Sequence, residues 1–517
     1  MPDAAVPFGE VWASLADLAG SDCVEAVCEA RAALSGEDPQ EVRSRAFQPV
    51  EFYPAAFHQR QLALLRRVGE PFCRPAPRTA AGATTAAFEA ASHREPAPLT
   101  GFGFFRVGED GRLYFITKSE HYHAPVGHTF PGYALLAVAR ELGIPQATHN
   151  NTRGHLTRLL EETLVRVAQA LPPGQEDPST APTGLNRVLN LETGSLAVEA
   201  GIKLMLARFY QVQEDSPPPP YRGRVPVFLV LGNDEGGLQG NYHGTTVLAQ
   251  LLRGMWPGFS RRLAEHGLFQ VAAVRPNVIA DLTAAFASWE RPPYKIAGFL
   301  HEFVMMNYGA RRLTPEFIRH AYSLCARHDV PTLADEIQSC LWVPGLFHFV
   351  EYGVRPTMVA LGKGFPGGEY PASRLLFDQR FDLLPQFGAL VTNGQEEIAS
   401  LAYLITLRWA LANAEVVRRI GERYEAQMRS LAARYPGLVA GIAGQRHLLG
   451  VEFHDLAVAR AFTAALNRAG LDISVQTYKS SCPPVALTKL PITVCDRVVD
   501  FVVERMEQAL SNLRPAP

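Results

Sequence analysis

Two stretches, PTLADEIQSC (331–340) and RPTMVALGKGFPGG (355–368), share one pattern. In each, a short apolar run ends abruptly: the first in Asp335 and Glu336, the second in Lys363 between two glycines. Short apolar runs of this kind are typical of strands buried in a parallel sheet. Ligands bind such sheets at the carboxyl ends of the strands. The pair therefore predicts an α/β fold with Asp335 and Lys363 at one ligand-binding edge.

Similar apolar runs recur through the middle of the chain, with helical patterns between them. The runs cover residues 225–231, 268–274, 294–299, 330–334 and 356–361. Alternation of this kind predicts a mostly parallel central sheet flanked by helices. Helices are expected at residues 11–18, 24–34, 133–142, 157–171, 315–328, 396–414, 416–435 and 494–510, and a strand hairpin at 101–117.

We divide the chain into four parts. Residues 1–95 form an N-terminal helical extension and linker, and residues 96–160 form the first part of a small domain with its connection. Residues 161–395 form the large ligand-binding domain, and residues 396–517 form a smaller C-terminal α/β domain. Proline-rich stretches near 172 and 214 are expected to be surface loops.

Composition excludes several classes of function. The chain has 517 residues, and its 49 lysines and arginines nearly balance its 51 aspartates and glutamates, so no global field favours nucleic acid or an anionic membrane. The first residues lack the order of a signal peptide, and no apolar run is long enough for a bilayer span, so we expect a cytoplasmic protein. Seven cysteines without a metal-type cluster predict buried free thiols and no metal site.

The acidic strand end has two interpretations. A carboxylate at Asp335 can keep a pyridinium nitrogen protonated, which makes pyridoxal phosphate an electron sink. Alternatively, Asp335 and Glu336 are a solvated strand end or a helix cap.

Lys363 also has two interpretations. Flanking glycines leave room for a cofactor over its amine, and burial would supply the neutral amine that Schiff-base formation needs. The alternative is a lysine in a surface turn, which the aspartate on the preceding strand makes the weaker interpretation.

A third element, NLETGSLAVEAGIKLMLARF (190–209), places a Gly-Ser turn at the start of a helical pattern. Free backbone amides and the positive end of a helix dipole suit a phosphate group there. Thr193 or Ser195 is also a plausible N-cap, and the two roles are compatible.

These elements, in this order, resemble the motifs of the class III aminotransferases, which are fold type I pyridoxal phosphate enzymes. The resemblance spans about residues 100–510. The matching segments are TGSLAVEAGIK (193–203), Tyr242-His243-Gly244, IAGFLHEFVMMNYG (296–309), LADEIQ (333–338), ALGKGFPGG (360–368) and Thr392.

The resemblance implies a role for each matching residue. Lys363 would form a Schiff base with pyridoxal phosphate and then move a proton between substrate and cofactor carbons. Asp335 would pair with the ring nitrogen, Gln338 would bond the ring hydroxyl, and Tyr242 would stack on the ring. Glu302 would lie close to the cofactor.

The remaining matches concern the phosphate and the quaternary structure. Gly194, Ser195 and a threonine of the neighbouring subunit, Thr392, would hold the phosphate, which implies a homodimer with shared active sites. His243 would lie beside the cofactor, although a histidine in a glycine-flanked loop also suits packing. The substrate would be a small-molecule amine or amino acid.

Several positions depart from the family pattern. Glu192 and Leu196 replace an asparagine and a glutamate around the phosphate turn, and Phe303 replaces a proline. Members that act on α-amino acids often carry an arginine near the C-terminus to clamp a carboxylate, whereas CPPVALTKLPIT (482–493) has Lys489 and no arginine. Alternatives to transamination on this fold are therefore a lyase, decarboxylase, epimerase or carbon–carbon bond-forming enzyme.

Two functions from other classes fit the sequence less well. The glycine-rich loop GNDEGGLQGN (232–241) follows a strand, as in a dinucleotide-binding dehydrogenase, but its glycine spacing is wrong and it leaves Lys363 unexplained. A non-catalytic binding protein on the same fold conflicts with the joint presence of Lys363, Asp335 and Gln338.

Overall fold

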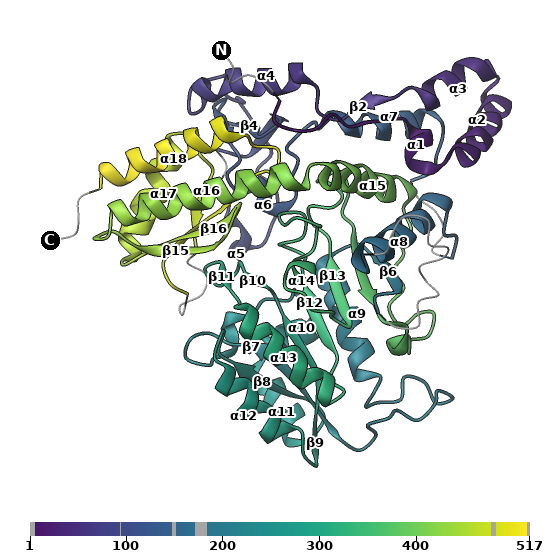
Figure 1. Cartoon of the computed structure of the whole chain (residues 1–517), viewed down its shortest axis with the longest axis vertical. Coiled ribbons are helices and arrows are strands. Elements are labelled where there is room, and N and C mark those ends of the chain that lie inside the picture. The colour runs from purple at the N-terminus through teal and green to yellow at the C-terminus, as the bar shows by residue number, and fades with distance from the viewer. Residues whose placement is uncertain (1–5, 94, 147–150, 171–183, 477–481, 514–517) are drawn as a thin grey trace.

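A computed structural model describes residues 6–93, 95–146, 151–170, 184–476 and 482–513. At its centre lies a seven-stranded sheet (Figure 1). The strand order is β6 (Arg187–Leu191), β14 (Ser373–Phe377), β13 (Met358–Leu361), β12 (Thr332–Asp335), β9 (Tyr294–His301), β7 (Val225–Leu231) and β8 (Gln270–Val274). The strands from β13 to β8 run parallel, and β14 runs antiparallel to both neighbours. The expected mostly parallel sheet is confirmed.

Side chains of the central strands point alternately to two apolar layers. In β7, Phe228 and Val230 belong to one buried cluster, and Leu229 and Leu231 belong to the other. Alternation with a period of two, apolar on both sides, is what a strand covered on both faces requires.

Helices cover both faces of the sheet. On one face lie α9 (Gly194–Leu206) and α10 (Val247–Leu252), and on the other lie α12 (Ile279–Trp289) and α13 (Pro315–Arg327). Each layer buries the apolar stripe of its helices against the strands, which is the main source of stability in such a sandwich.

A second, smaller unit is formed by two parts of the chain, residues 98–115 and residues 397–511. A three-stranded sheet of β3 (Pro98–Phe102), β4 (Phe105–Gly108) and β5 (Leu113–Phe115) contains the expected hairpin. It joins the C-terminal unit through a bridge from Phe115 to Leu471 and through the amide of Lys489, which donates to Thr117 O at 2.7 Å. The C-terminal elements are α15 (Glu397–Ala412), α16 (Ala414–Arg434), β15 (Val439–Gln445), β16 (Leu448–Phe453), α17 (Leu456–Arg468), β17 (Ser474–Val475), β18 (Val485–Lys489) and α18 (Asp496–Ser511).

The N-terminal extension contains several short helices, and its first elements differ from those expected. Residues 11–18 were expected to be a helix, whereas β1 (Trp12–Ala13) is a short strand and α1 (Leu15–Ala19) starts only after Ser14. Ser14 and Asp17 form a reciprocal capping box, which fixes the start of the helix. The rest comprises α2 (Ser21–Ser35), α3 (Pro39–Phe47), β2 (Val50–Glu51), α4 (Ala55–Leu64) and the 3-10 turn η2 (Leu65–Arg67). Figure 1 shows α1, α2 and α3 grouped at one end of the molecule beside α7.

Connecting elements complete the chain. They are α5 (Ala86–Glu89), α6 (Ser119–Tyr122), η3 (Pro131–Tyr133), α7 (Ala134–Glu141), α8 (His155–Ala168), η5 (Leu238–Gly240), α11 (Pro257–Glu265), β10 (Val304–Met305), β11 (Arg311–Arg312), α14 (His348–Glu351) and η6 (Gln379–Phe381). The proline-rich stretch near 214 is a loop, as expected, and most of the stretch near 172 lies outside the described residues.

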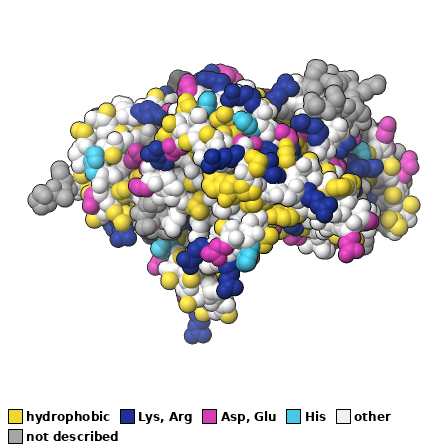
Figure 2. Space-filling model, turned by 90° about the horizontal axis from the view of Figure 1, so that it is seen from below, with side chains coloured by type: hydrophobic (Ala, Val, Ile, Leu, Met, Phe, Trp, Pro, Cys, Tyr) yellow, Lys and Arg dark blue, Asp and Glu magenta, His cyan; other side chains and the backbone are white. Residues whose placement is uncertain are grey.

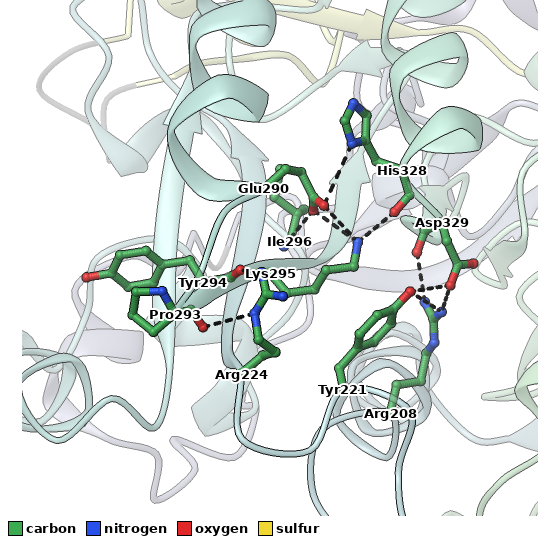
Figure 3. A network of polar contacts seen from close by, with 10 residues as sticks. All are labelled: Arg208, Tyr221, Arg224, Glu290, Pro293, Tyr294, Lys295, Ile296, His328 and Asp329. Carbon is green, nitrogen blue, oxygen red and sulfur yellow. Dashed lines mark hydrogen bonds and ion pairs between the residues drawn. The ribbon is translucent and has the colours of Figure 1, made fainter.

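A buried ion pair lies at the amino end of the parallel strands (Figure 3). Lys295, the second residue of β9, is 4% exposed and donates to both carboxylate oxygens of Glu290 at 3.0 and 3.1 Å. It also donates to His328 O at 2.6 Å. All three of its ammonium protons therefore have acceptors, and its charge is compensated.

The surface and the cysteines agree only in part with expectation. Basic and acidic side chains are intermixed on the face seen in Figure 2. Among the described residues, no helix combines the length and apolarity that crossing a bilayer requires. The cysteines are free; Cys28, Cys325, Cys340 and Cys495 are buried, but Cys73 is exposed, so the prediction of buried thiols was wrong for that residue.

Candidate active site

The segments 331–340 and 355–368, which contain Asp335 and Lys363, meet at the edge of the sheet formed by the carboxyl ends of the parallel strands. β12 and β13 are parallel neighbours, with Asp335 paired to Ala360, so the end of each strand reaches the same edge. Lys363 follows β13 by two residues. A cavity of about 260 Å³ opens there. The sequence-predicted residues that line it are Gly194, Ser195, Tyr242, His243, Asp335, Gln338 and Lys363.

Asp335 faces the cavity and is held by its neighbours. It is 6% exposed, and its Oδ2 accepts a hydrogen bond from His243 Nδ1 at 2.9 Å. Its Oδ1 accepts from the Ile337 amide at 3.2 Å. His243 therefore does more than pack its loop, because it fixes the orientation of a buried carboxylate.

Glu336 behaves differently from its neighbour. It is fully buried, and its carboxylate accepts from the amides of His348 and Phe349 at the start of α14, at 2.8 and 3.0 Å. The helix-cap interpretation is thus correct for Glu336, and the solvated strand end is wrong for both acids.

Lys363 has a strained backbone, and its partly buried side chain lines the cavity. Its φ of +42° is in the left-handed region, and its amine makes no hydrogen bond or ion pair with the described residues. Nζ lies 4.7 Å from the centroid of the Tyr122 ring. Burial lowers the pKa of Lys363 to about 8, although the charges of Asp335 and Glu302 oppose the shift. The surface-turn interpretation is wrong.

The start of α9 forms another wall of the cavity. Thr193 is the N-cap, and its hydroxyl accepts from the Ser195 amide at 3.1 Å, so the capping interpretation is correct for Thr193. Gly244 has φ of +116°, and a Cβ there would lie 2.7 Å from Ser195 Oγ. This glycine lets the Tyr242–Gly244 loop approach the N-terminus of the helix.

Two further polar atoms face this region without a partner among the described residues. Gln338 Oε1 and His243 Nε2 are both buried and make no hydrogen bond there. Buried polar atoms are normally paired, so these two favour a ligand or water as the missing partner. Tyr242 completes this wall, and the Arg253 guanidinium lies 5.0 Å from its ring centroid.

Two predicted residues do not line the cavity. Glu302 is buried just beyond β9, and it reaches Lys363 through its charge. Thr392 is exposed in the loop before α15. The single chain therefore does not bring Thr392 to the cavity.

Sequence reasoning missed the segment from Ser119 to His123. Four consecutive residues, Ser119 to Tyr122, have φ between +44° and +73°, a left-handed turn without glycine. The turn places His123 in the cavity wall and the Tyr122 ring beneath the Lys363 amine. A second lysine, Lys489, is buried and lies 4.1 Å from the same ring centroid. Nothing in the letters KSEHYH signals this conformation.

These residues fit a phosphorylated aromatic cofactor. A helix N-terminus, an oriented carboxylate, an unpartnered amide oxygen and a poised amine surround one cavity. The geometry supplies sites for a phosphate, a ring nitrogen and a carbonyl carbon.

Comparison with known proteins decides the family. The sequence profile described as aminotransferase class-III matches residues 100–510. The chain belongs to the class III aminotransferase family. This aminotransferase is a pyridoxal phosphate-dependent enzyme, as the sequence motifs predicted, and the dehydrogenase interpretation is wrong.

Individual relatives of the aminotransferase are distant. An ornithine aminotransferase from Halalkalibacterium halodurans is 27% identical over 63% of this chain and 76% of its own length. An acetylornithine/succinyldiaminopimelate aminotransferase from Yersinia pestis is 26% identical over 73% of this chain and 84% of its own. The solved adenosylmethionine-8-amino-7-oxononanoate aminotransferase from Methanocaldococcus jannaschii has a TM-score of 0.66, with 17% identity, over 84% of this chain and 96% of its own. This structural similarity confirms the predicted fold type I architecture.

Proposed function

We propose that this aminotransferase binds pyridoxal phosphate through Lys363 and moves an amino group between an aliphatic amine or amino acid and an oxo compound. The observation that carries the proposal is the Lys363 amine, which lies in the cavity wall on a partly buried side chain, makes no hydrogen bond with the described residues, and has a pKa lowered to about 8. At pH 7 roughly a tenth of such an amine is neutral and nucleophilic. The names of the two curated relatives support the substrate class.

Each residue of the cavity has a separate role in the proposed reaction. Pyridoxal phosphate, when bound, supplies an electron sink for the charge left as a proton leaves the substrate carbon. The Lys363 amine holds and moves that proton. Asp335 keeps the pyridine nitrogen protonated, and His243 orients Asp335 through their 2.9 Å hydrogen bond. Gln338 Oε1 accepts from the ring hydroxyl.

Other residues bind and enclose the cofactor. Gly194 and Ser195 hold the phosphate at the start of α9, and Tyr242 covers the ring. Glu302 acts on Lys363 through its charge. Thr392 completes the phosphate site of a second subunit in a homodimer, which accounts for its exposed position in the single chain.

Absorption spectra test the chemistry. Wild type and Lys363→Ala are each mixed with pyridoxal phosphate, reduced with borohydride and mapped by peptide mass. We expect a visible band and a label on Lys363 in wild type only. An amine donor should bleach the band, and an oxo acid should restore it. A band retained during product formation would indicate a lyase or epimerase, and a labelled Lys363→Ala would refute the role of Lys363.

Complementation tests the shared site. Thr392→Glu places a negative charge against the phosphate, and Lys363→Ala removes the amine. If Thr392 acts in the partner's site, mixed dimers of these two inactive variants contain one intact site each, and random mixing restores about a quarter of wild-type activity. No recovery despite subunit exchange, verified by mass, would refute the shared site.

The cytoplasmic location stays part of the proposal. The odd number of cysteines argues against a disulfide framework of the secreted type. Fractionation of native cells tests it: the enzyme should be found with cytoplasmic markers, and its recovery in the medium would refute it.

A further inference from the structure

A second cavity lies between α17 and β5. Its volume is about 530 Å³, and it shares no lining residue with the Lys363 cavity. Part of its wall comes from His93, Glu95 and Pro96, which precede the region matched by the family profile. This cavity is therefore built partly from the N-terminal linker of this chain.

One face of α17 is turned toward this cavity. Arg460, Asn467 and Arg468 line it, and their spacing of seven and eight residues places them on one stripe of the helix. Neither arginine makes a side-chain ion pair or hydrogen bond that is seen among the described residues. Both arginines are exposed at the mouth of the cavity, where their guanidinium groups can donate to an anion bound in it.

The arginines of the neighbouring helix α16 are different. All five pair with carboxylates of α16 or α18, at N–O distances of about 3 Å or less. They are Arg418, Arg419, Arg423, Arg429 and Arg434. The unpaired arginines of α17 are thus not a general property of the surface of this domain.

The charge of the cavity is positive. Four lysine and arginine side chains line it against two carboxylates, an excess of two positive charges in a chain whose formal net charge is −2. One of the carboxylates, Asp472, is already bonded to Lys118 and Arg106, at 2.9 Å each. Arg112 donates to Gly69 O, which fixes its side chain in the wall.

Lys118 connects this cavity to the active site. It immediately precedes the left-handed turn, in which Ser119 Oγ donates to Lys489 O and Glu120 pairs with Arg106 and His128. The turn ends at Tyr122, whose ring lies against the Lys363 amine. An anion that competes with Asp472 for Lys118 would act on the base of this turn.

We propose that the α17 cavity binds a small anion with at least two phosphate or carboxylate groups, and that the bound anion changes the affinity of the Lys363 site for its amine substrate. The α17 cavity is separate from the cofactor phosphate site. Binding of the anion does not depend on the proposed function, whereas the effect on the amine substrate rests on it.

Calorimetry on the holoenzyme tests the binding. Pyrophosphate and citrate are titrated separately, so that the tighter of the two identifies a phosphate or a carboxylate ligand. We expect saturable binding of at least one, with one site per chain. Arg460→Ala/Arg468→Ala should weaken it roughly tenfold or more, because two charge-assisted contacts are lost.

The matched control is Arg418→Ala/Arg429→Ala on α16, which removes the same charge from ion-paired positions that do not line the cavity and should change the affinity less than about twofold. Equal weakening by both double variants would indicate a nonspecific charge effect and overturn the site. The absence of saturable binding by either anion in wild type would also overturn it.

Kinetics test the coupling. With a saturating amount of the tighter anion, the KM for the amine donor should change roughly fivefold or more in wild type and remain unchanged in Arg460→Ala/Arg468→Ala. Binding without any change in KM would refute the coupling. An inactive enzyme that still binds the anion at α17 would refute the proposed function alone, so the two failures are distinguishable.

Discussion

Lys295 and Lys363 lie at opposite ends of strands in the same sheet and have opposite surroundings. Lys295, at the amino end of β9, has Glu290 and a carbonyl as acceptors (Figure 3). Lys363, after the carboxyl end of β13, has no hydrogen-bond acceptor among the described residues. Burial lowers the pKa of both amines, but only Lys295 has a bonded carboxylate to oppose it. A buried lysine becomes structural when it is paired and reactive when it is not.

Removing the unpaired amine should have the largest effect on activity. Lys363→Met keeps the length of the side chain but has no nucleophile, so we expect turnover to fall roughly 10³-fold or more. Stability should not fall, because no ion pair is broken. Single-turnover kinetics and urea unfolding measure the two properties. Turnover within tenfold of wild type would contradict this expectation.

Removing the paired amine should have the reverse effect. Lys295→Met leaves the mostly buried Glu290 carboxylate without its lysine, with the Ile296 amide at 2.9 Å and His328 Nδ1 at 3.8 Å as its remaining contacts, so unfolding free energy should fall by about 3 kcal/mol. Turnover per folded molecule should be unchanged, since Lys295 is at the far end of the strands. Urea unfolding of both methionine variants side by side measures the contrast. Equal stability of the two variants would remove the distinction between the lysines.

The pH dependence of the reaction between Lys363 and pyridoxal phosphate tests the difference between the two lysines further. The folded pKa of Lys363, about 8, is depressed below that of a free lysine. The neutral amine, which is the nucleophile, therefore increases about tenfold per pH unit below pH 8 and levels off above it. Stopped-flow mixing of cofactor-free protein with pyridoxal phosphate should follow this curve. A rate that still rises steeply to pH 10 would indicate an unshifted amine.

The same depressed pKa affects stability. Between about pH 8 and the higher pKa of the unfolded chain, the unfolded state binds the proton and the folded state does not, so unfolding free energy rises with pH in this window. Cofactor-free wild type should show this rise relative to Lys363→Met. Parallel pH profiles for the two proteins would contradict it.

The smallest effect is expected when both partners of the ion pair are replaced. Lys295→Met/Glu290→Gln removes both charges together, and stability should return to within about 1 kcal/mol of wild type. The double-mutant cycle from urea unfolding gives the coupling between the two residues. A double variant as unstable as Lys295→Met would show that packing, and not charge, explains the loss.

Sequence patterns predicted the interior of the sheet better than its edge. β7 has the predicted bounds, because its apolar run has the length of a strand and is buried on both faces of the sheet. β6 and β14 were not predicted, since Asn190 and Arg374 interrupt their apolar runs. Arg374 is fully buried, and its guanidinium lies over the Tyr403 ring, a contact with a helix that no local pattern encodes.

The candidate site shows the same limit. Asp335 and Lys363 could be predicted because each ends an apolar run. Tyr122 and His123 could not, because their place depends on a left-handed turn that tertiary contacts hold without glycine. Thr392 belongs to a shared site that a single chain does not test.

The contacts between the two ends of the small unit have a consequence for synthesis. Thr117 bonds to Asp472 O, and Ser119 bonds to Lys489 O, 370 residues further along the chain. At about 5–20 residues per second, a ribosome needs on the order of 20–70 s to supply that distant partner. Until then β5 lacks its neighbour from the C-terminal unit, and limited proteolysis of ribosome-bound chains should cleave near residue 117. During most of its synthesis the nascent enzyme therefore exposes the unpaired edge of β5, which is a site where chaperones would bind.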